Sequence, residues 1–272
     1  MTDSIVSDAI LSHPGCVRDV NEDSIAFAIP EILTATGGPS FIAIVADGMG
    51  GHSAGEIASR IAVDTILGAH DEIGDSIPQW LARTFAAANE AILTHAQSEP
   101  DCAGMGTTCT VLVMRNGTIH LGHIGDSRAY QYRSGVLSQI SEDHSAVGEL
   151  VRAGKMTAAE AKNSPFRNII QRALGTKPKV SPQIWHDPTP AEQGDAFLIC
   201  SDGLTNLLDD EILARFITHR TPLDACQLLL EKAISAGAPD NVSVGVFSVQ
   251  ASTGTPPPGK QSKRAGAASS PT

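Results

Sequence analysis

Four aspartates stand at the ends of apolar runs, where strands are expected to stop or start. Asp47 follows residues 44–46, Asp126 follows 123–125, Asp202 follows 198–201, and Asp240 shortly precedes the run from Val242. An ionised carboxylate at the edge of a buried strand costs free energy unless something compensates its charge. If the four converge they repel one another, and all-oxygen ligation of a divalent cation, Mg²⁺ or Mn²⁺ rather than zinc, is the usual remedy. Each aspartate taken alone also fits a plain turn, so the metal hypothesis depends on their meeting in space.

A glycine-rich stretch, residues 48–52 (GMGGH), lies between a predicted strand and a predicted helix. A P-loop requires Lys and then Ser or Thr after its last glycine, and the dinucleotide fingerprint requires a glycine where Ser53 stands. Because neither requirement is met, the match to a nucleotide-binding motif is weak.

The composition is typical of a globular protein that is not expected to bind nucleic acid or anionic membranes. Hydrophobic residues make up 42% of the 272 residues and charged residues 18%, which is enough apolar material for a core and excludes a wholly disordered chain. Nineteen Lys and Arg against thirty Asp and Glu give a net charge of -11, which disfavours nucleic acid and anionic membrane surfaces as partners.

The cysteines and the N-terminus predict a cytoplasmic protein. The number of cysteines is odd, no CxxC spacing occurs, and we expect all five to be small core residues in a reducing compartment: Cys16, Cys102, Cys109, Cys200 and Cys226. The first eleven residues contain two aspartates and no basic residue, unlike a signal peptide. No apolar run reaches the ~20 residues of a membrane-spanning helix.

Apolar periodicity predicts both strands and helices around these residues. Strands are expected at 4–12 and 41–46, a helix capped by Ser53, and a second helix at 77–97. Strands at 107–114, 118–124, 129–132 and 136–140 are joined by Asn116-Gly117 and Ser134-Gly135 turns and suggest an antiparallel meander.

The remaining pattern completes an α+β domain. A helix is expected at 150–162, where Thr157 and Glu160 form a capping box, and further helices at 209–216 and 223–236. Strands are expected at 196–200 and 242–249. Separate runs of strands and helices indicate α+β rather than βαβ alternation. We assign residues 1–250 to one domain and 251–272, rich in Pro, Ser and Ala, to a disordered tail.

Eight short motifs in a fixed order carry a resemblance to a known family. They are residues 15–23 (GCVRDVNED), 45–52 (VADGMGGH), 106–108 (GTT), 124–130 (IGDSRAY), 142–145 (EDHS), 172–175 (RALG), 201–204 (SDGL) and 240–244 (DNVSV). Together they resemble the PP2C-type (PPM) metal-dependent protein phosphatases of the bacterial type, across residues 5–249. Any one motif is weak, whereas the ordered set is very specific.

The resemblance implies a fold and a reaction. The fold would be an α-β-β-α sandwich, with two stacked antiparallel sheets flanked by helices. The reaction would be hydrolysis of phosphoserine and phosphothreonine in proteins, in which a hydroxide bridging two Mn²⁺ or Mg²⁺ ions attacks phosphorus. The partners would be phosphorylated proteins and a cognate Ser/Thr kinase whose action the enzyme opposes.

The resemblance also implies residue roles. Asp47 would bridge both ions, the Gly48 carbonyl would bind the second ion, and Glu22 would reach that ion partly through water. Asp202 and Asp240 would complete the first site, while Asp126, together with Asp202, matches a third metal site of bacterial members. Asp23 and Asn241 would support these ligands from behind, and Arg18 would bind the phosphate through its planar fork of donors.

The sequence departs from eukaryotic members of that family at Met49, where they carry a histidine proposed as the general acid. His52 could substitute, but we assign no residue to that role. Residues 145–165 correspond to a variable flap beside the site, which would tune substrate choice. Two alternatives remain open: a catalytically dead module that only binds phosphoproteins, since fold does not guarantee activity, and a phosphatase of small phosphate esters.

Overall fold

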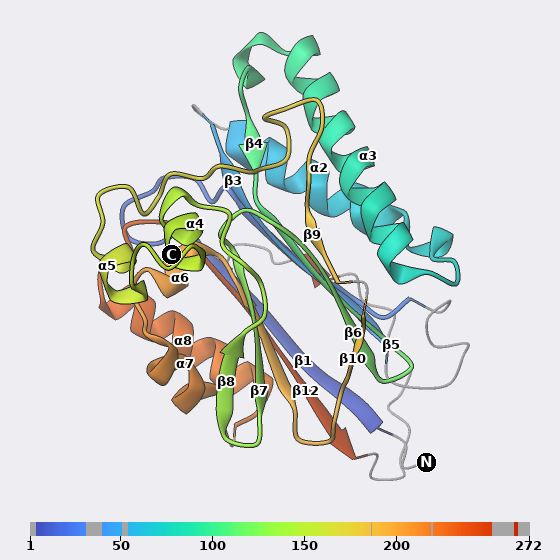
Figure 1. The fold of residues 1–272 in the computed structure, drawn as a ribbon, viewed down its shortest axis with the longest axis vertical. Coiled ribbons are helices and arrows are strands. Elements are labelled where there is room, and N and C mark those ends of the chain that lie inside the picture. The colour runs from blue at the N-terminus through green and yellow to red at the C-terminus, as the bar shows by residue number, and fades with distance from the viewer. Residues whose placement is uncertain are drawn as a thin grey trace, which may run out of the picture.

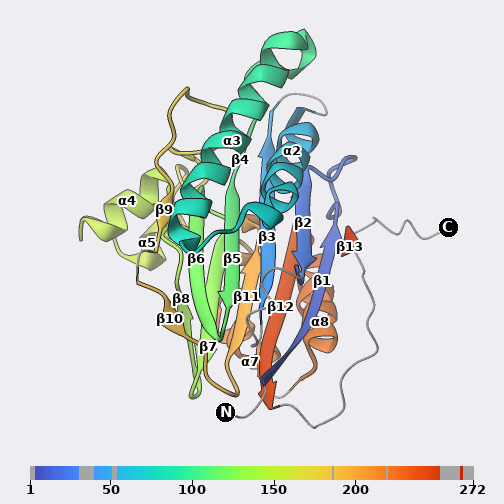
Figure 2. The ribbon, with the colours of Figure 1, turned by 90° about the vertical axis from the view of Figure 1, so that its right-hand side faces the viewer.

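Two antiparallel sheets lie face to face, and helices cover the outer face of each (Figures 1 and 2). This computed structural model describes residues 4–30, 40–50, 54–185, 187–218, 220–251 and 264–265. The expected α-β-β-α sandwich of the α+β class is confirmed. No helix in these ranges is both long and apolar enough to cross a membrane.

The first sheet joins the two ends of the domain. Its strand order is β1 (Ser4–His13), β12 (Val242–Ala251), β11 (Ala196–Cys200), β7 (Arg128–Arg133) and β8 (Val136–Gln139). Buried residues of α6 (Asp202–Thr205), α7 (Asp210–Ile217) and α8 (Pro222–Ser235) pack on its outer face.

The second sheet carries the central part of the chain. Its order is β10 (Thr189–Pro190), β6 (Thr118–Ile124), β5 (Cys109–Arg115), β3 (Phe41–Met49), β2 (Asp23–Ala28) and β13 (Arg264–Ala265), with β4 (Gly106–Thr107) on β3 and β9 (Gln183–Ile184) on β6. The outer face is covered by α2 (Ala54–Gly68) and α3 (Ile77–Ser98), with short 3-10 turns at His70–Glu72 and Pro100–Cys102. The remaining helices, α4 (Ala146–Arg152) and α5 (Ala158–Lys162), lie at one end of the sandwich (Figure 1).

An apolar layer holds the two sheets together. Phe247 of the first sheet is fully buried, and its ring centroid lies 5.2 Å from that of Phe27 and 5.1 Å from that of Phe41, both in the second sheet. Aromatic rings bury large areas and pack in such offset geometries, so this three-ring stack is a principal contact between the sheets.

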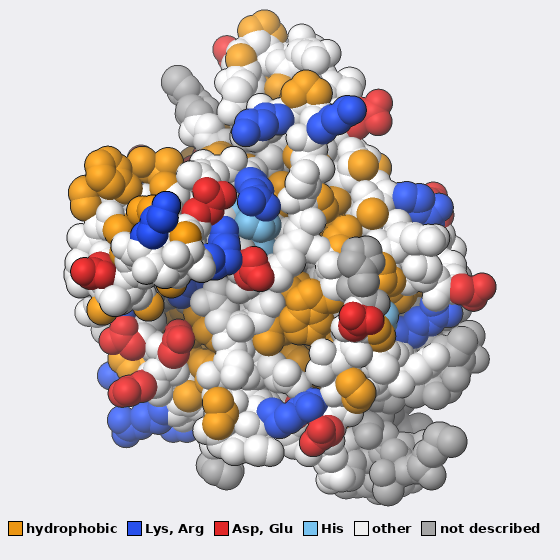
Figure 3. Space-filling model, viewed as in Figure 1, with side chains coloured by type: hydrophobic (Ala, Val, Ile, Leu, Met, Phe, Trp, Pro, Cys, Tyr) orange, Lys and Arg blue, Asp and Glu red, His pale blue; other side chains and the backbone are white. Residues whose placement is uncertain are grey.

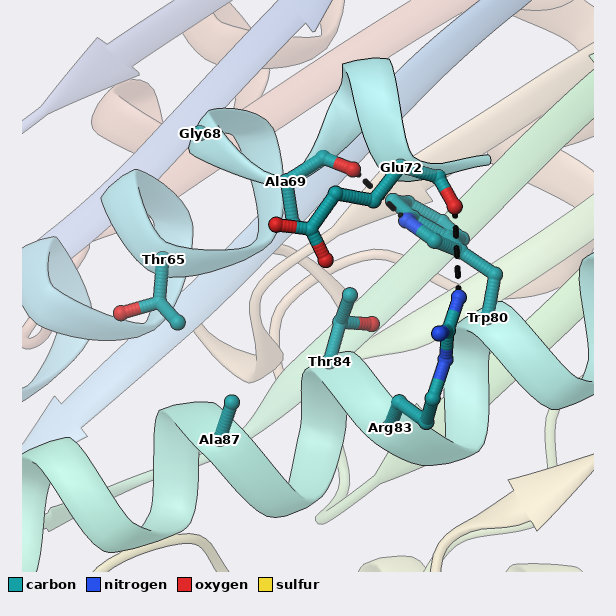
Figure 4. Close-up of a pocket in the computed structure, with 8 residues that line it drawn as sticks. All are labelled: Thr65, Gly68, Ala69, Glu72, Trp80, Arg83, Thr84 and Ala87. Carbon is teal, nitrogen blue, oxygen red and sulfur yellow. Dashed lines mark hydrogen bonds between the residues drawn. The ribbon is translucent and has the colours of Figure 1, made fainter. Parts of the chain in front are cut away.

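Helix α3 is fixed to the end of α2 through Trp80 (Figure 4). The Trp80 indole Nε1 donates to the Ala69 carbonyl at 2.9 Å, and the Arg83 guanidinium donates to the Glu72 carbonyl at 3.2 Å. A cavity of about 320 Å³ lies beside these contacts. None of the acidic residues expected to carry chemistry lines it, so this cavity is separate from the candidate site.

The predicted meander is wrong. β5 and β6 belong to the second sheet, whereas β7 and β8 belong to the first. The chain changes sheets at Gly125, whose φ of +111° favours glycine, and a Cβ there would lie 2.5 Å from Thr108 Cβ. Apolar periodicity predicted where the strands lie, but it gives no information about which sheet each strand joins.

Other sequence expectations also need correction. The helix expected at 150–162 is the two helices α4 and α5, separated by Gly154 at φ +66°; the capping box at Thr157 starts the second of them. β3 runs on to Met49 instead of ending at residue 46, and β2 was not predicted. Cys16 is exposed, while the other four cysteines are buried as expected.

The predicted tail lies mostly outside the described residues. Ala251, placed in the tail from composition, is the last residue of β12 and pairs with Ser4 of β1. Two tail residues, Arg264 and Ala265, pair with Phe27 and Ala26 at the edge of β2. The domain boundary at residue 250 stays a prediction.

We expect Phe247→Ala to lower the free energy of unfolding by about 3–5 kcal/mol, because it removes the ring on which both other rings of the stack rest. Urea unfolding followed by circular dichroism measures this change. Leu223→Ala on α8, where Leu223 is 50% exposed, serves as the control and should stay within about 0.5 kcal/mol of the parent chain. Equal losses in the two variants would contradict the assigned role of the stack.

Candidate active site

Asp47 lies near the end of β3, where neighbouring residues fix its backbone on both sides. The Asp47 N–H donates to Thr108 Oγ1 at 2.9 Å. The Asp47 carbonyl accepts from Thr107 Oγ1 and from the Thr108 N–H, each at 2.9 Å. The side chain stays partly accessible to solvent. A rigid backbone with an accessible carboxylate is what a ligand position requires.

Glu22 and Asp23 lie beside Asp47 at the start of β2. Asp23 stands directly opposite Asp47 in the β2–β3 ladder. The Glu22 carbonyl accepts from the Gly48 N–H at 3.1 Å, which fixes Gly48 next to Glu22. Asp23 is buried, and its Oδ2 accepts from Ser201 Oγ of the other sheet at 2.7 Å. This hydrogen bond joins the two sheets at the candidate site.

The first sheet contributes Asp202 and Asp240. Asp202 is separated from the end of β11 by Ser201 and begins α6, while Asp240 stands two residues before the first residue of β12. β11 and β12 are antiparallel neighbours, so the end of one and the start of the other meet at the same edge of the sheet. Asn206 Nδ2 donates to Asp202 Oδ2 at 3.0 Å.

Asp126 lies in the segment that carries the chain from one sheet to the other. It is 6% exposed. The preceding Gly125 exchanges two backbone-directed bonds with His144: the His144 N–H donates to the Gly125 carbonyl at 2.7 Å, and the Gly125 N–H donates to His144 Nδ1 at 3.2 Å. Next to it, Arg128 forms a bidentate pair with Asp143, with contacts of 2.6 to 3.1 Å. Asp126 is therefore held at a well-braced turn.

The carboxylates act on one another electrostatically. Burial raises the pKa of Asp47 well above its usual value, and repulsion from the other aspartates raises it further: Asp23, Asp202, Asp126 and Asp240. Burial likewise raises the pKa of Asp23 to about 7, with Asp202 and Asp240 adding to the effect. Burial and then Asp202 raise the pKa of Asp126, and burial and then Asp240 raise that of Asp202. The aspartates singled out from sequence thus meet in one place.

The same site contains carboxylate oxygens without donors. Among the described residues, Glu22 Oε1, Asp23 Oδ1 and Asp126 Oδ1 are buried and have no hydrogen-bond partner. Buried polar atoms are normally satisfied, and all three of these belong to carboxyl groups, which repel one another when ionised. Their chemistry fits a bound hard cation.

The carboxylates do not form a closed ligand set as they stand. In the described part of the chain, no group of three or more His, Cys, Asp or Glu side chains is arranged to hold an ion. Instead, Arg18 Nη2 places a positive charge 3.0 Å from Asp240 Oδ2.

Arg18 faces the carboxylates from an exposed loop. Its Nη2 lies 3.0 Å from Asp240 Oδ2, and its Nη1 lies 3.9 Å from Glu22 Oε2. The guanidinium side chain is 49% exposed. It can therefore reach a ligand from solvent while staying next to the acidic cluster.

Asn241 holds this loop in place. Its Nδ2 donates to the carbonyls of Pro14 and Val20, each at 2.9 Å, and its Oδ1 accepts from the Glu22 N–H at 2.8 Å. The loop also turns at Gly15 with φ of +82°, where a Cβ would lie 2.2 Å from the Asp240 carbonyl oxygen. The loop that carries Arg18 and Glu22 is thus fixed to the chain just before β12.

Gly55 was not identified from the sequence. It lies in the first turn of α2, and a Cβ on it would lie 2.4 Å from Glu22 Oε1 and 2.9 Å from the Gly48 carbonyl carbon. Its backbone N–H faces the Glu22 carboxylate and lowers its pKa, although burial, the larger effect, leaves that pKa raised. No sequence signal shows such a close approach between a helix and a strand.

No residue emerges as the general acid. Met49 is the last residue of β3, and His52 lies outside the described residues. The two buried histidines near Asp126, His123 and His144, stack with ring centroids 5.0 Å apart. Burial lowers the pKa of His123 to about 4 and that of His144 to about 3, so both are neutral near pH 7 and brace the turn.

Comparisons with known proteins agree with this geometry. The family model described as protein phosphatase 2C matches residues 18–232. A serine/threonine phosphatase of Listeria monocytogenes is 39% identical over 209 residues, which cover 75% of this chain and 82% of that protein. The crystal structure of the Mycobacterium tuberculosis serine/threonine phosphatase PstP superposes with a TM-score of 0.80 at 36% identity, over 90% of this chain and 99% of that one.

A structure of the PstP catalytic domain in complex with two manganese ions has a TM-score of 0.79 at 34% identity, over 91% of this chain and 99% of that one. The family match spans most of the domain, and the relatives are similar over most of its length. The chain is therefore a member of the protein phosphatase 2C family and a serine/threonine protein phosphatase.

Proposed function

We propose that this chain hydrolyses phosphoserine and phosphothreonine in proteins at a site for two Mn²⁺ or Mg²⁺ ions, with a third ion beside them, and so opposes a Ser/Thr kinase. The observation that carries this proposal is the cluster of carboxylates that raise one another's pKa and leave three buried oxygens without donors. The manganese ions of the related PstP catalytic domain support it.

The proposed assignment of residues to ions follows the resemblance to the family. Asp47, Asp202 and Asp240 would hold the first ion, and Asp47, the Gly48 carbonyl and Glu22 the second; Asp126 with Asp202 would hold the third. Asp23 would stay behind Asp47 in the ladder, fixed by Ser201. When bound, two such cations lower the pKa of a shared water, so that hydroxide is available near neutral pH, and they offset the charge of the phosphate.

Arg18 would orient the phosphate. Its planar guanidinium presents two parallel donors to two phosphate oxygens, a geometry that lysine cannot reproduce. The loop anchored by Asn241 keeps Arg18 within reach of Asp240, so the phosphate would be bound next to the proposed ions. In the absence of substrate, Asp240 occupies one edge of the guanidinium.

Two alternatives are separable from this proposal. A module that only binds phosphoproteins would show no turnover. This chain has an Asp or Glu at every position where the family resemblance implies an acidic ligand, which argues against such a module. An enzyme for small phosphate esters would use the same site but would not prefer phosphopeptides. Both alternatives therefore predict results different from those below.

We expect release of phosphate from a phosphothreonine peptide to stop on exhaustive chelation and to return with Mn²⁺ or Mg²⁺. Alkylation of cysteines should have little effect, because the described site contains none and four of the five are buried. Turnover that survives chelation would contradict metal dependence. The absence of turnover with any divalent ion would favour the binding-only module.

Asp47 and Asp126 should differ in their effect on metal binding. Asp47→Asn removes a charge proposed to be shared by both core ions, so we expect turnover to fall more than about 100-fold, beyond the cost of losing an outer partner of a metal site. Asp126→Ala should lower turnover about 10-fold and leave the two tight ions bound. Calorimetric titration with Mn²⁺ measures the number of tight ions in each variant.

The metal-free forms give a second measurement. Asp47→Asn should leave the metal-free melting temperature unchanged or raise it, because fewer carboxylates then repel one another. The assigned roles would be wrong if Asp126→Ala lost the tight ions or if Asp47→Asn retained both.

Gly55→Ala should weaken binding of the second ion and leave binding of the first ion nearly unchanged. The added Cβ displaces the Glu22 carboxylate and presses on Gly48, so we expect about a 10- to 100-fold loss of affinity for one Mn²⁺ and little change for the other. Gly68→Ala, at the far end of the same helix, is the matched control, because its Cβ would meet no atom within 4 Å. Identical Mn²⁺ titrations of the two variants would show that Gly55 has no such role.

A further inference from the structure

The charge of the chain is strongly segregated. Residues 145–180, which contain α4 and α5, carry seven Lys and Arg against two Glu. The rest of the chain carries twelve Lys and Arg against twenty-eight Asp and Glu. We call residues 145–180 the basic segment. Its charge of +5 stands against -16 elsewhere, which indicates a surface built to attract an anionic partner.

Both ends of the basic segment are fixed to the candidate active site. Directly before its start, His144 bonds to Gly125, the neighbour of Asp126. Near its end, Leu174 exchanges two backbone hydrogen bonds with Thr107, at 2.9 and 3.1 Å, and the Thr107 hydroxyl donates to the Asp47 carbonyl. A molecule bound at the site therefore lies beside the basic segment.

The cations of this segment are exposed, and several are unpaired. Three of the seven form ion pairs: Arg152 with Glu142, Arg172 with Glu149, and Lys162 with Asp209. Within the described ranges, the other four form none: Lys155, Arg167, Lys177 and Lys179. Charges left free in this way can pair with a partner without first breaking a contact.

Apolar side chains are exposed among these cations. Phe166 is 60% exposed, Ile169 49% and Leu150 38%, and the Ile169 N–H donates to the Phe166 carbonyl at 3.2 Å. In Figure 3, blue and orange side chains, with some red ones among them, lie interspersed where Figure 1 places α4 and α5. Large exposed apolar residues gathered in one place are typical of interaction surfaces.

We propose that the basic segment selects phosphorylated protein segments in which acidic and apolar residues flank the phosphorylated Ser or Thr. The acidic residues pair with the free cations, of which Lys155 lies between α4 and α5 and Arg167 follows α5, and an apolar residue packs on Phe166. This inference rests on the proposed function, because the phosphate is taken to bind at the carboxylate site. The occupant is an acidic peptide segment, which the -11 chain would otherwise repel.

Two phosphothreonine peptides test the proposal, one flanked by Glu and Leu and the other by Gln and Leu, alongside p-nitrophenyl phosphate, which is too small to contact the basic segment. With Mn²⁺ present, we expect a higher kcat/KM for the acidic peptide, carried mainly by KM. That preference should shrink as NaCl approaches physiological ionic strength, where screening acts over ~8 Å.

The variant Lys155→Gln/Arg167→Gln should lose about five-fold in kcat/KM for the acidic peptide, the size expected from two exposed ion pairs. Its kcat/KM for the Gln peptide and for p-nitrophenyl phosphate should stay unchanged. Arg83→Gln/Arg215→Gln removes the same charge from α3 and α7 and is the matched control, for which we expect no change in preference. Phe166→Ser should lower kcat/KM equally for both peptides and leave kcat/KM for p-nitrophenyl phosphate unchanged.

Some outcomes would overturn the proposal. Equal kcat/KM for the two peptides, or a preference that survives Lys155→Gln/Arg167→Gln, would show that the basic segment does not select acidic flanks. A preference lost equally in the Arg83→Gln/Arg215→Gln control would point to overall charge instead. An enzyme inert toward all three substrates with Mn²⁺, or one that hydrolyses p-nitrophenyl phosphate but neither peptide, would overturn the proposed function as well. Equal turnover of the two peptides would overturn only the peptide selection.

Discussion

Six carboxylates crowd one end of the sandwich, and their mutual repulsion in a partly dehydrated place is the constraint on which the rest of the site depends. Without compensation, burial and like charge together push the pKa of Asp47, Asp23, Asp126 and Asp202 upward. The chain compensates in part with the guanidinium of Arg18, which pairs with Asp240. Such a cluster lowers folding stability, so its retention is better explained by function than by packing.

Hydrogen bonds from neutral side chains hold the acidic residues of the site in place. Thr107 and Thr108 fix Asp47, and Ser201 reaches Asp23 from the opposite sheet. Asn241 satisfies three backbone groups of the loop that carries the site's arginine. Because these supports are neutral, they position the acids without cancelling their charge. The acidic cluster therefore keeps its attraction for a cation while its geometry stays fixed.

The sequence was informative about strands and their ends, and less so about how they associate. Apolar runs predicted that Asp47, Asp126, Asp202 and Asp240 stand at strand ends, and the ordered motifs indicated the family. β6 and β7 belong to different sheets. This depends on which strands pair in the folded protein, and apolar periodicity gives no information about that pairing. The break between α4 and α5 did have a local signal in Gly154 and the Thr157 capping box, whereas the close approach of Gly55 to β3 had none.

The acids of the site come from both sheets: Glu22, Asp23 and Asp47 lie in or directly beside β2 and β3, while Asp202 follows β11 and Asp240 precedes β12. The cluster therefore exists only when the sheets are docked, and a cation that binds it binds the native state and not the unfolded chain. By linkage, each tenfold rise in free ion concentration above the dissociation constant adds about 1.4 kcal/mol to stability per ion. The resistance of the fold to heat and proteolysis would then follow the supply of the ion, so that metal scarcity lowers the amount of folded protein as well as its activity.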